Sequence, residues 1–335
     1  MSQSARLRRS VFFLILLSVI SSCSQSPHSP DERYFLISTN VQLPYWQAAG
    51  AGFRRAASQL KVRAEFVGPD AYDAKAEVEE FQKAVRQKAS GILVSPANPS
   101  LMRPEIDAAI ASGVPVITLD SDSPGSHRLL FIGTNNYQAG VMGGGVAAKR
   151  LQGKGNVIVF TMPNQANLKE RLDGYESVFA AHPQIKIVEI VDIKGDSRVA
   201  FDRTMEVLDK GSPAVDAFVC LEASAGKEVA EVLNRKNDTA KIVVAMDTDQ
   251  ETLEWIRKGV IAATIAQKPF TMAFFGLRLL DDLHHQKASP QGSATAQDPF
   301  ASLPRFVDTG ATLIDKNNLD EFIKARDSAT GKNPV

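Results

Sequence analysis

The sequence predicts an α/β protein with two similar doubly wound domains, each built on a parallel sheet. From residue 33 to residue 119, short and almost continuous apolar stretches alternate with amphipathic stretches of helical period. The same alternation starts again near residue 156. This pattern is typical of βαβ units, whose parallel strands are covered on both faces. A chain of 335 residues has room for two such domains.

The first series of elements ends in a glycine-rich stretch. Strands are expected near 34–38, 62–67, 91–95, 115–119 and 130–132, with helices near 45–60, 74–87 and 101–112. The stretch 139–151 contains four glycines but has helical spacing. It lacks both the GxGxxG and the GxxxxGK[ST] patterns of phosphate-binding loops. We therefore expect small residues that let two helices pack closely.

The second series repeats the first and closes with an irregular segment. Strands are expected near 156–160, 185–191, 217–221, 242–245 and 262–266, and helices near 168–181, 199–210, 226–236, 250–258 and 271–283. Asp249 is expected to cap the helix at 250–258, and Gly259 to end it. Residues 284–302, rich in Gln, Ser, Ala and Pro, predict a surface loop or a disordered insertion. A strand at 305–314 and a helix at 317–325 complete the chain.

The N-terminus predicts export. Three arginines precede a ten-residue apolar run and the small residues before Cys23, which is the pattern of a secretory signal. The run is too short to span a bilayer comfortably. Residues 20–23 resemble a bacterial lipobox, in which Cys23 would carry the lipid and residues 24–32 would form a tether. The alternative is ordinary signal cleavage, with Cys23 incidental.

Composition and motifs exclude several functions. The formal net charge is zero, which gives no support to a nucleic-acid partner. No GxSxG, HExxH or paired-cysteine motif is present, so we expect no enzyme, no cofactor and no metal. His284 and His285 are expected to be surface imidazoles, because no further ligands with suitable spacing accompany them.

Polar side chains follow the expected strands of both series. Asp120, Asp247 and Gln267 each come directly after an apolar strand, and Tyr45 and Trp46 stand just past the first strand. In open α/β sheets, ligands bind outside the carboxyl ends of the strands. Carboxylates and amides can bind hydroxyl groups, and aromatic rings can cover the apolar face of a sugar ring. The sequence therefore predicts a cleft for a neutral polyhydroxylated ligand, although each residue taken singly is also a plausible turn, cap or core residue.

Five stretches carry a more specific resemblance: Ser38–Thr39–Asn40 with Pro44–Tyr45–Trp46, Val116–Asp120, Lys169–Gly174, Ala245–Asp247 and Ala263–Gln267. With them, the chain from about residue 33 onward resembles periplasmic sugar-binding proteins of the ribose-binding type, the substrate-binding components of ABC importers. The ribose binders have arginine after the aspartate, whereas this chain has Ser121, so the implied ligand need not be ribose.

The resemblance implies ligand contacts and a hinge. The implied contacts are Asn40 (or Gln42), Tyr45, Trp46, Ser95, Asp120, Asn135, Arg171, Glu222, Asp247 and Gln267. At Glu222 the asparagine usual in the family is missing. The implied division is residues 33–134 with 268–304 for the N-terminal domain, and 135–267 with 305–330 for the C-terminal domain. Three crossovers, near Asn135, Gln267 and Asp308, would form the hinge between them.

The implied role is capture of a pentose or hexose by a monomeric lipoprotein, periplasmic or at the cell surface, that serves an ABC permease. The membrane would be reached only through the lipid anchor. A second possibility is a sensory lipoprotein that presents its ligand to a membrane receptor or kinase. A repressor's ligand domain shares the fold, but no helix-turn-helix precedes Arg33.

Overall fold

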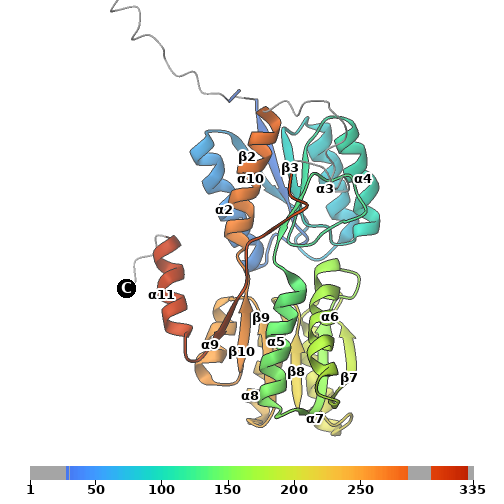
Figure 1. Cartoon of the computed structure of the whole chain (residues 1–335), viewed down its shortest axis with the longest axis vertical. Helices are drawn as coiled ribbons and strands as arrows, with labels where there is room; N and C mark the ends of the chain where they lie inside the picture. Colours follow the sequence, from blue (N-terminus) through green and yellow to red (C-terminus); the bar gives the residue numbers. More distant parts are fainter. Residues whose placement is uncertain (1–27, 30, 286–302, 331–335) are drawn as a thin grey trace, which may run out of the picture.

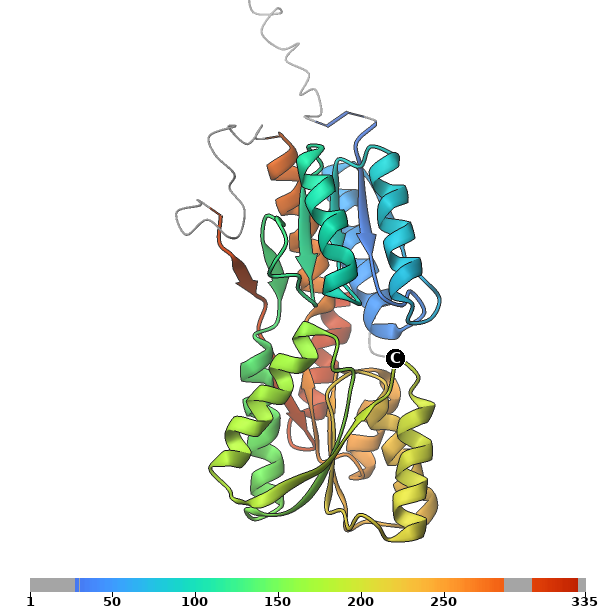
Figure 2. The same ribbon diagram turned by 90° about the vertical axis from the view of Figure 1, so that its right-hand side faces the viewer.

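A computed structural model describes residues 28–29, 31–285 and 303–330. The expected signal peptide, Cys23, most of the tether and nearly all of the segment 284–302 lie outside these residues. Two α/β domains stand end to end along the long axis of the molecule (Figures 1 and 2). Within the described ranges, no helix combines the length and the hydropathy that a bilayer span requires.

The first domain contains a six-stranded sheet in the order β11-β5-β4-β3-β1-β2, in which every neighbouring pair is parallel. Its strands are β1 (Arg33–Ile37), β2 (Arg63–Val67), β3 (Gly91–Val94), β4 (Val116–Leu119), β5 (Phe131–Gly133) and β11 (Phe306–Asp308). Its helices are α2 (Pro44–Leu60), α3 (Ala74–Arg86), α4 (Pro99–Ala111) and α10 (Pro269–His285). The sequence predicted this architecture.

The second domain repeats the arrangement in the order β12-β10-β9-β8-β6-β7. Its strands are β6 (Lys154–Thr161), β7 (Gln184–Asp192), β8 (Ala217–Cys220), β9 (Ile242–Met246), β10 (Ala263–Ala266) and β12 (Thr312–Asp315). Its helices are α5 (Asn136–Arg150), α6 (Ala166–Ala180), α7 (Arg198–Lys210), α8 (Ala225–Lys236), α9 (Gln250–Lys258) and α11 (Leu319–Thr330). Only the edge strand β12 runs antiparallel to its neighbour.

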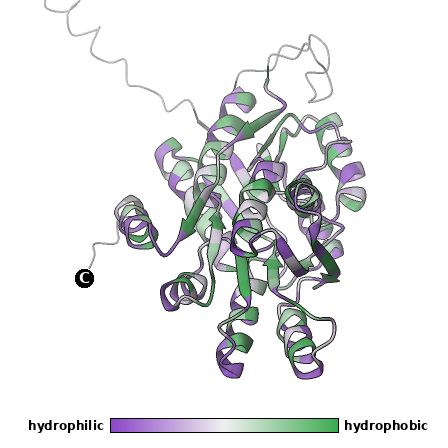
Figure 3. Ribbon diagram, turned by 60° about the horizontal axis from the view of Figure 1, so that its bottom comes forward, coloured by the Kyte–Doolittle hydropathy of each residue, from purple (hydrophilic) through white to green (hydrophobic). Residues whose placement is uncertain are grey.

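Strand β1 contributes side chains to two apolar layers. Tyr34 and Leu36 pack with the cluster that includes Phe53 of α2, whereas Phe35 and Ile37 pack with the cluster that includes Phe81 of α3. Successive side chains of a strand point to opposite faces, so helices on both sides are needed to bury them. Figure 3 shows the result, with hydrophobic strands inside and helices that carry their polar side outward.

Two details of the expected chain are wrong. The single strand expected at 305–314 is two strands, because β11 pairs with β5 in the first sheet and β12 pairs with β10 in the second. Residues 306–308 therefore belong to the first domain, not to the second. His284 and His285 lie in the last turn of α10 and do not begin an irregular segment.

The chain crosses between the domains three times, after β5, after β10 and after β11. Two of these crossovers are hydrogen-bonded to each other. The Thr309 amide donates to the Gly133 carbonyl at 2.8 Å, and the Asn135 amide donates to Asp308 Oδ1 at 3.1 Å. The three linkers thus lie where the hinge was expected.

The glycine-rich stretch forms α5, which packs along α6 (Figure 2). A Cβ atom on Gly140 would come within 2.0 Å of the Arg171 carbonyl oxygen, and one on Gly174 within 2.2 Å of the Tyr137 carbonyl oxygen. A side chain at either position would force the helices apart. This confirms the expectation of close helix packing. Gly145 faces open space instead, and a Cβ atom there would meet no atom within 4 Å.

Candidate ligand-binding cleft

The polar strand ends of both domains meet in one cavity of about 60 Å³ between them. Its polar lining residues are Thr39, Asp120, Gln165, Asn167, Arg171, Glu222, Asp247 and Gln267, and Tyr45 and Trp46 add aromatic surface. The carboxyl ends of parallel strands point the same way, which explains why residues distant in sequence converge here.

Two aspartates occupy equivalent positions in the two domains. Asp120 follows β4 and Asp247 follows β9, and both have a backbone φ of +63°. Each donates its amide to the neighbouring strand at 2.9 Å, Asp120 to Ile132 and Asp247 to Ile265. The left-handed conformation is uncommon for residues other than glycine, although aspartate tolerates it. Such strain concentrates at binding and catalytic sites, and here it turns two strand ends at the cleft.

Arg171 of α6 is the buried cation of the site, with 2% of its surface exposed. Its guanidinium donates to Asn136 Oδ1 at 2.9 Å, to the Leu221 carbonyl at 2.7 Å and to Gln267 Oε1 at 2.8 Å. Gln267 in turn donates to both carboxylate oxygens of Asp247 at 3.2 Å. These bonds fix the guanidinium and connect it through Gln267 to the carboxylate of Asp247.

Asp120 joins the two domains across the cleft. The Tyr45 hydroxyl donates to Asp120 Oδ1 at 2.6 Å within the first domain. Asn167, which belongs to α6 of the second domain, donates to Asp120 Oδ2 at 3.2 Å. Farther along the same edge, Gly195 lies against Tyr72: a Cβ atom on Gly195 would come within 2.3 Å of Tyr72 Cβ. The domains are therefore in contact across the mouth of the cleft.

The buried carboxylates of the cleft resist ionisation. Burial raises the pKa of Asp247 to about 7; Arg171 opposes this rise and the charge of Asp120 adds to it. Burial likewise raises the pKa of Asp120 and of Glu222, with Arg171 acting in the opposite direction on both. One cation thus faces three carboxyl groups. Ligand hydroxyls that donate to these carboxylates would relieve part of the desolvation.

Seven of the ten predicted contacts line the cavity: Tyr45, Trp46, Asp120, Arg171, Glu222, Asp247 and Gln267. Glu222 also caps α8, since its carboxylate accepts from the Ser224 and Ala225 amides. Trp46 also packs in the core of the first domain, and Tyr45 packs against that core. Both aromatic residues therefore line the cavity and contribute to the core, the two alternatives that the sequence left open.

The other three predicted contacts lie elsewhere. Asn40 closes a turn by accepting from the Gln42 amide at 2.8 Å. Asn135 is exposed and caps α5 by accepting from the Gln138 amide at 3.1 Å. Ser95 is fully buried just after β3 and does not line the cavity, and its hydroxyl has no hydrogen-bond partner among the described residues.

Sequence reasoning missed three amides of the site. Asn136, the neighbour of the predicted Asn135, is buried and binds Arg171. Gln165 and Asn167 stand at the start of α6 and line the cavity. The sequence signal for Gln165 and Asn167 was their position at the start of the helix that follows β6, at the same edge of the sheet as the predicted residues.

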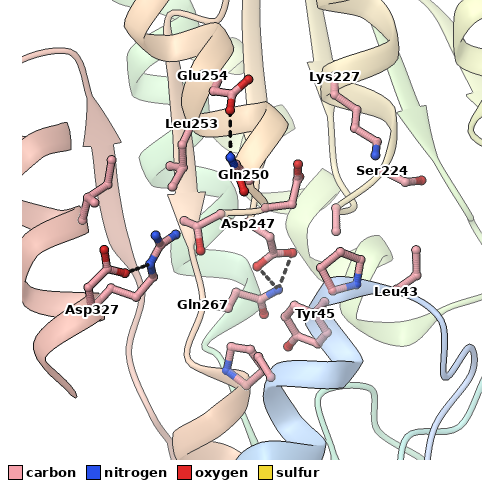
Figure 4. Close-up of a pocket in the computed structure, with 18 of the residues that line it drawn as sticks. Leu43, Tyr45, Ser224, Lys227, Asp247, Gln250, Leu253, Glu254, Gln267 and Asp327 are labelled. Atoms are coloured by element: carbon pink, nitrogen blue, oxygen red, sulfur yellow. Dashed lines mark hydrogen bonds and ion pairs between the residues drawn. The ribbon is translucent and has the colours of Figure 1, made fainter. Parts of the chain in front are cut away.

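A second and larger cavity of about 660 Å³ adjoins the cleft. It shares Leu43, Tyr45, Ala223, Asp247 and Gln267 with the cleft and continues between α9 and α11. In Figure 4 the hydrogen-bonded pair of Asp247 and Gln267 lies between Tyr45 and the side chains of Gln250 and Leu253. The pair therefore borders both cavities.

A family model described as "Periplasmic binding protein domain" matches residues 34–287. The chain belongs to the periplasmic binding protein family. Among solved structures, it is 32% identical to a sugar-binding protein of a sugar ABC transporter from Bacillus halodurans, with a TM-score of 0.74 over 87% of this chain and 99% of the other. It is 35% identical to AraP, an arabinose-binding protein from Geobacillus stearothermophilus, with a TM-score of 0.72 over 88% and 99%.

Among curated periplasmic binding proteins, the "Ribose import binding protein RbsB" of Bacillus subtilis is 22% identical over 295 residues, which cover 83% of this chain and 93% of that relative. These relatives are named for binding or import, not for catalysis. Membership of this family confirms the predicted fold and agrees with a role in binding rather than catalysis.

Proposed function

We propose that this periplasmic binding protein captures one small sugar in the cleft and delivers it to an ABC importer. The observation that carries the proposal is the ring of polar side chains in the cleft, in which Asp120 and Asp247 come from equivalent strand ends of the two domains. Relatives of the same fold are named for arabinose, ribose and xylose or arabinose, which supports a sugar of this size.

The chemistry of the cleft suits a polyhydroxylated ligand. Each sugar hydroxyl that leaves water needs a protein partner, because an unsatisfied buried polar group costs about 1–3 kcal/mol. The carboxylates of Asp120 and Asp247 accept hydrogen bonds, and the guanidinium of Arg171 donates them. Tyr45 and Trp46, whose rings meet edge to face at 5.1 Å, offer apolar surface for the carbon face of a sugar ring.

Closure of the cleft follows from the three crossovers. Ligand would bind to one domain first, and rotation about the linkers at 134–135, 267–268 and 309–311 would bring the other domain over it. The hydrogen bond between Asn167 and Asp120 is one contact that a closed state would make. An importer that recognises the closed state would then distinguish loaded from empty protein.

The expected anchor at Cys23 lies outside the described residues and forms a separate part of the proposal. Cys23 would carry lipid and hold the domains at the membrane, as the lipobox-like residues 20–23 suggest. Replacing Cys23 with serine should release the protein from the membrane fraction. A variant that stays membrane-bound would contradict the anchor and leave sugar binding untouched.

A sensory role is the second candidate. XylFII, a chain of the same fold that is 27% identical to this one, has been solved in a XylFII–LytSN complex. A protein of this fold can therefore dock on another protein. Co-purification of the loaded protein with a permease would favour transport, and co-purification with a receptor alone would favour sensing.

A thermal-shift screen tests the sugar itself. The chain from residue 24 onward, which keeps every described residue, should be screened against pentoses, hexoses and polyols. A ligand that binds only the folded state raises the melting temperature by mass action. We expect one or two sugars to do so. If no sugar raises the melting temperature at concentrations up to roughly several millimolar, sugar binding is refuted.

A further inference from the structure

We propose a zinc site at the start of the first domain, built from His28, Glu32, Asp281 and His285. One ligand atom from each of the four residues lies within 4.8 Å of all the others. Two imidazoles and two carboxylates form a ligand set that zinc accepts in four-coordinate sites. The site lies at the end of the domain where the described chain begins and α10 ends, away from the cleft (Figure 1).

The distances suit a tetrahedral ion after a small contraction. His28 Nε2 lies 3.0 Å from Asp281 Oδ2, and His285 Nε2 lies 3.2 Å from Glu32 Oε1. Zinc bonds of about 2.0–2.1 Å place tetrahedral ligand atoms about 3.3 Å apart. The closest pairs already have this spacing, so only the widest pairs need to approach, by about 1–1.5 Å.

The ring of His285 is oriented as a zinc ligand requires. Its Nδ1 lies 2.8 Å from the main-chain carbonyl of Asp281, and a carbonyl can only accept, so Nδ1 carries the proton. In the neutral ring, Nε2 then presents its lone pair to Glu32 Oε1, which is also an acceptor. Two acceptors at 3.2 Å repel each other unless a cation, or a second proton on the ring, lies between them. A carbonyl that fixes the imidazole in this way is usual at zinc sites.

The carboxylates are held in place and poorly solvated. Glu32 and Asp281 are 7% and 5% exposed. The buried Tyr34 hydroxyl donates to Asp281 Oδ1 at 3.0 Å, which leaves Oδ2 for the cluster. Glu32 Oε1 accepts from the Ser29 amide at 2.6 Å, whereas its buried Oε2 has no hydrogen-bond partner among the described residues. Two buried carboxylates, one with an unsatisfied oxygen, favour a divalent cation.

The sequence does not reveal this site because its halves are 253 residues apart. His285 is exposed, as expected of a surface imidazole, but the sequence did not predict that His28, Glu32 and Asp281 lie beside it. A zinc ion here would join the first described residues, a few positions after the expected lipid anchor, to the end of α10. It would fasten the tether to the domain without touching the sugar cleft.

The test is zinc titration of the chelator-treated chain from residue 24 onward at pH 7.5, followed by calorimetry and by competition with a chromogenic chelator. We expect one Zn²⁺ per chain with a Kd below about 10 µM. His285→Ala and Glu32→Gln should each weaken binding at least about tenfold. Zinc should also slow amide hydrogen exchange at residues 31–33, which lie beside the site.

A matched control uses His127, whose Nδ1 lies 3.3 Å from the single carboxylate of Asp107 on the exposed surface. His127→Ala should leave zinc binding unchanged. Calcium should not compete, because imidazole ligands disfavour it. Absence of 1:1 binding, binding that survives both ligand variants, or equal binding of calcium would overturn the assignment. If 1:1 binding of zinc is absent, protonated histidines paired with the carboxylates would explain the cluster.

Discussion

Replacing Asp247 with asparagine should make the empty protein more stable and the sugar complex weaker. Asp247 is buried at the strained end of β9, and within the described part of the chain its carboxylate accepts only from Gln267, at 3.2 Å. Burial raises its pKa from 3.8 to about 7, against the attraction of Arg171. Above pH 7 the folded protein must therefore hold an unfavourable negative charge. Asparagine has nearly the same shape and carries no charge.

The size of the effect follows from the two pKa values. Between pH 4 and pH 7 the folded state binds more protons at this site than the unfolded state does, so stability falls as the pH rises. The stability that proton binding at Asp247 contributes to the folded state is complete below about pH 4 and lost above about pH 7. The difference between 3.8 and about 7 corresponds to at most roughly 4 kcal/mol. We expect Asp247→Asn to raise the free energy of unfolding by about 1–4 kcal/mol at pH 8, and by almost nothing at pH 4.

The affinity should move the other way. A ligand hydroxyl that donates to a carboxylate gains about 1.5–3 kcal/mol, so its loss should weaken binding by about 10- to 150-fold. Urea unfolding at pH 4 and pH 8 measures the first effect, and calorimetric titration with the sugar found by the screen measures the second. Asp173→Asn is the matched control, because the side chain of Asp173 is 43% exposed and pairs with the more exposed Lys169 at 2.9 Å.

A stability difference between Asp247→Asn and the wild type that is the same at pH 4 and pH 8 would refute this reasoning. Asp247 would then ionise normally in the fold. Unchanged sugar affinity would separately remove Asp247 from the binding site.

Three further substitutions, two of them with a glycine control, test the packing and the electrostatics of the same region. Gly140→Ala should cost about 1–3 kcal/mol of stability by separating α5 from α6, whereas Gly145→Ala should add about 0.5–1 kcal/mol, the usual gain in an open helix position. Gly195→Ala should weaken sugar binding by obstructing the contact across the cleft mouth, beyond any effect of Gly259→Ala. Arg171→Ala should cost about 3–5 kcal/mol at pH 8, because three carboxyl groups lose their cation, and less at pH 5, where more of them are protonated.

The controls in this series are built into the chain. Gly195 and Gly259 have φ values of +79° and +81°, so an alanine strains both backbones alike, but only Gly195 has a neighbour in the other domain. Equal sugar affinity in the two variants would show that the contact is irrelevant to closure. Urea unfolding at both pH values measures the other variants. An Arg171→Ala loss that is independent of pH would show that Arg171 acts through packing alone.

Most of the fold could be predicted because the sequence signals are local. Asp249 caps α9 by accepting from the Thr252 amide at 3.0 Å, and Gly259 ends that helix in the left-handed conformation, as expected. The apolar strands are buried on both faces, so they lack alternation but remain recognisable as short continuous runs. Once the strands are located, their ends are known, and Asp120 and Asp247 come directly after two of them.

The errors arise where the answer depends on pairing or on a single residue of register. Residues 305–314 look like one strand because both halves of the segment have strand-like composition. Only the separate partners of the two halves, β5 and β10, divide them. Of the pair Asn135 and Asn136, one caps α5 and the other binds Arg171. A helix turns by about 100° per residue, so neighbouring side chains face different surroundings and sequence alone does not distinguish them. The histidine–carboxylate cluster needs contacts between the two ends of the chain.

Binding of sugar between the domains is tested most directly by calorimetric titration of the wild type with the sugar selected by the screen, beside Asp120→Asn and Asp247→Asn. We expect one binding site per chain and a similar loss of affinity in both variants, because each aspartate is the strand-end acceptor of its own domain. Full affinity in both variants would contradict a site between the domains. Loss in only one would place the sugar on a single domain and remove the basis for closure.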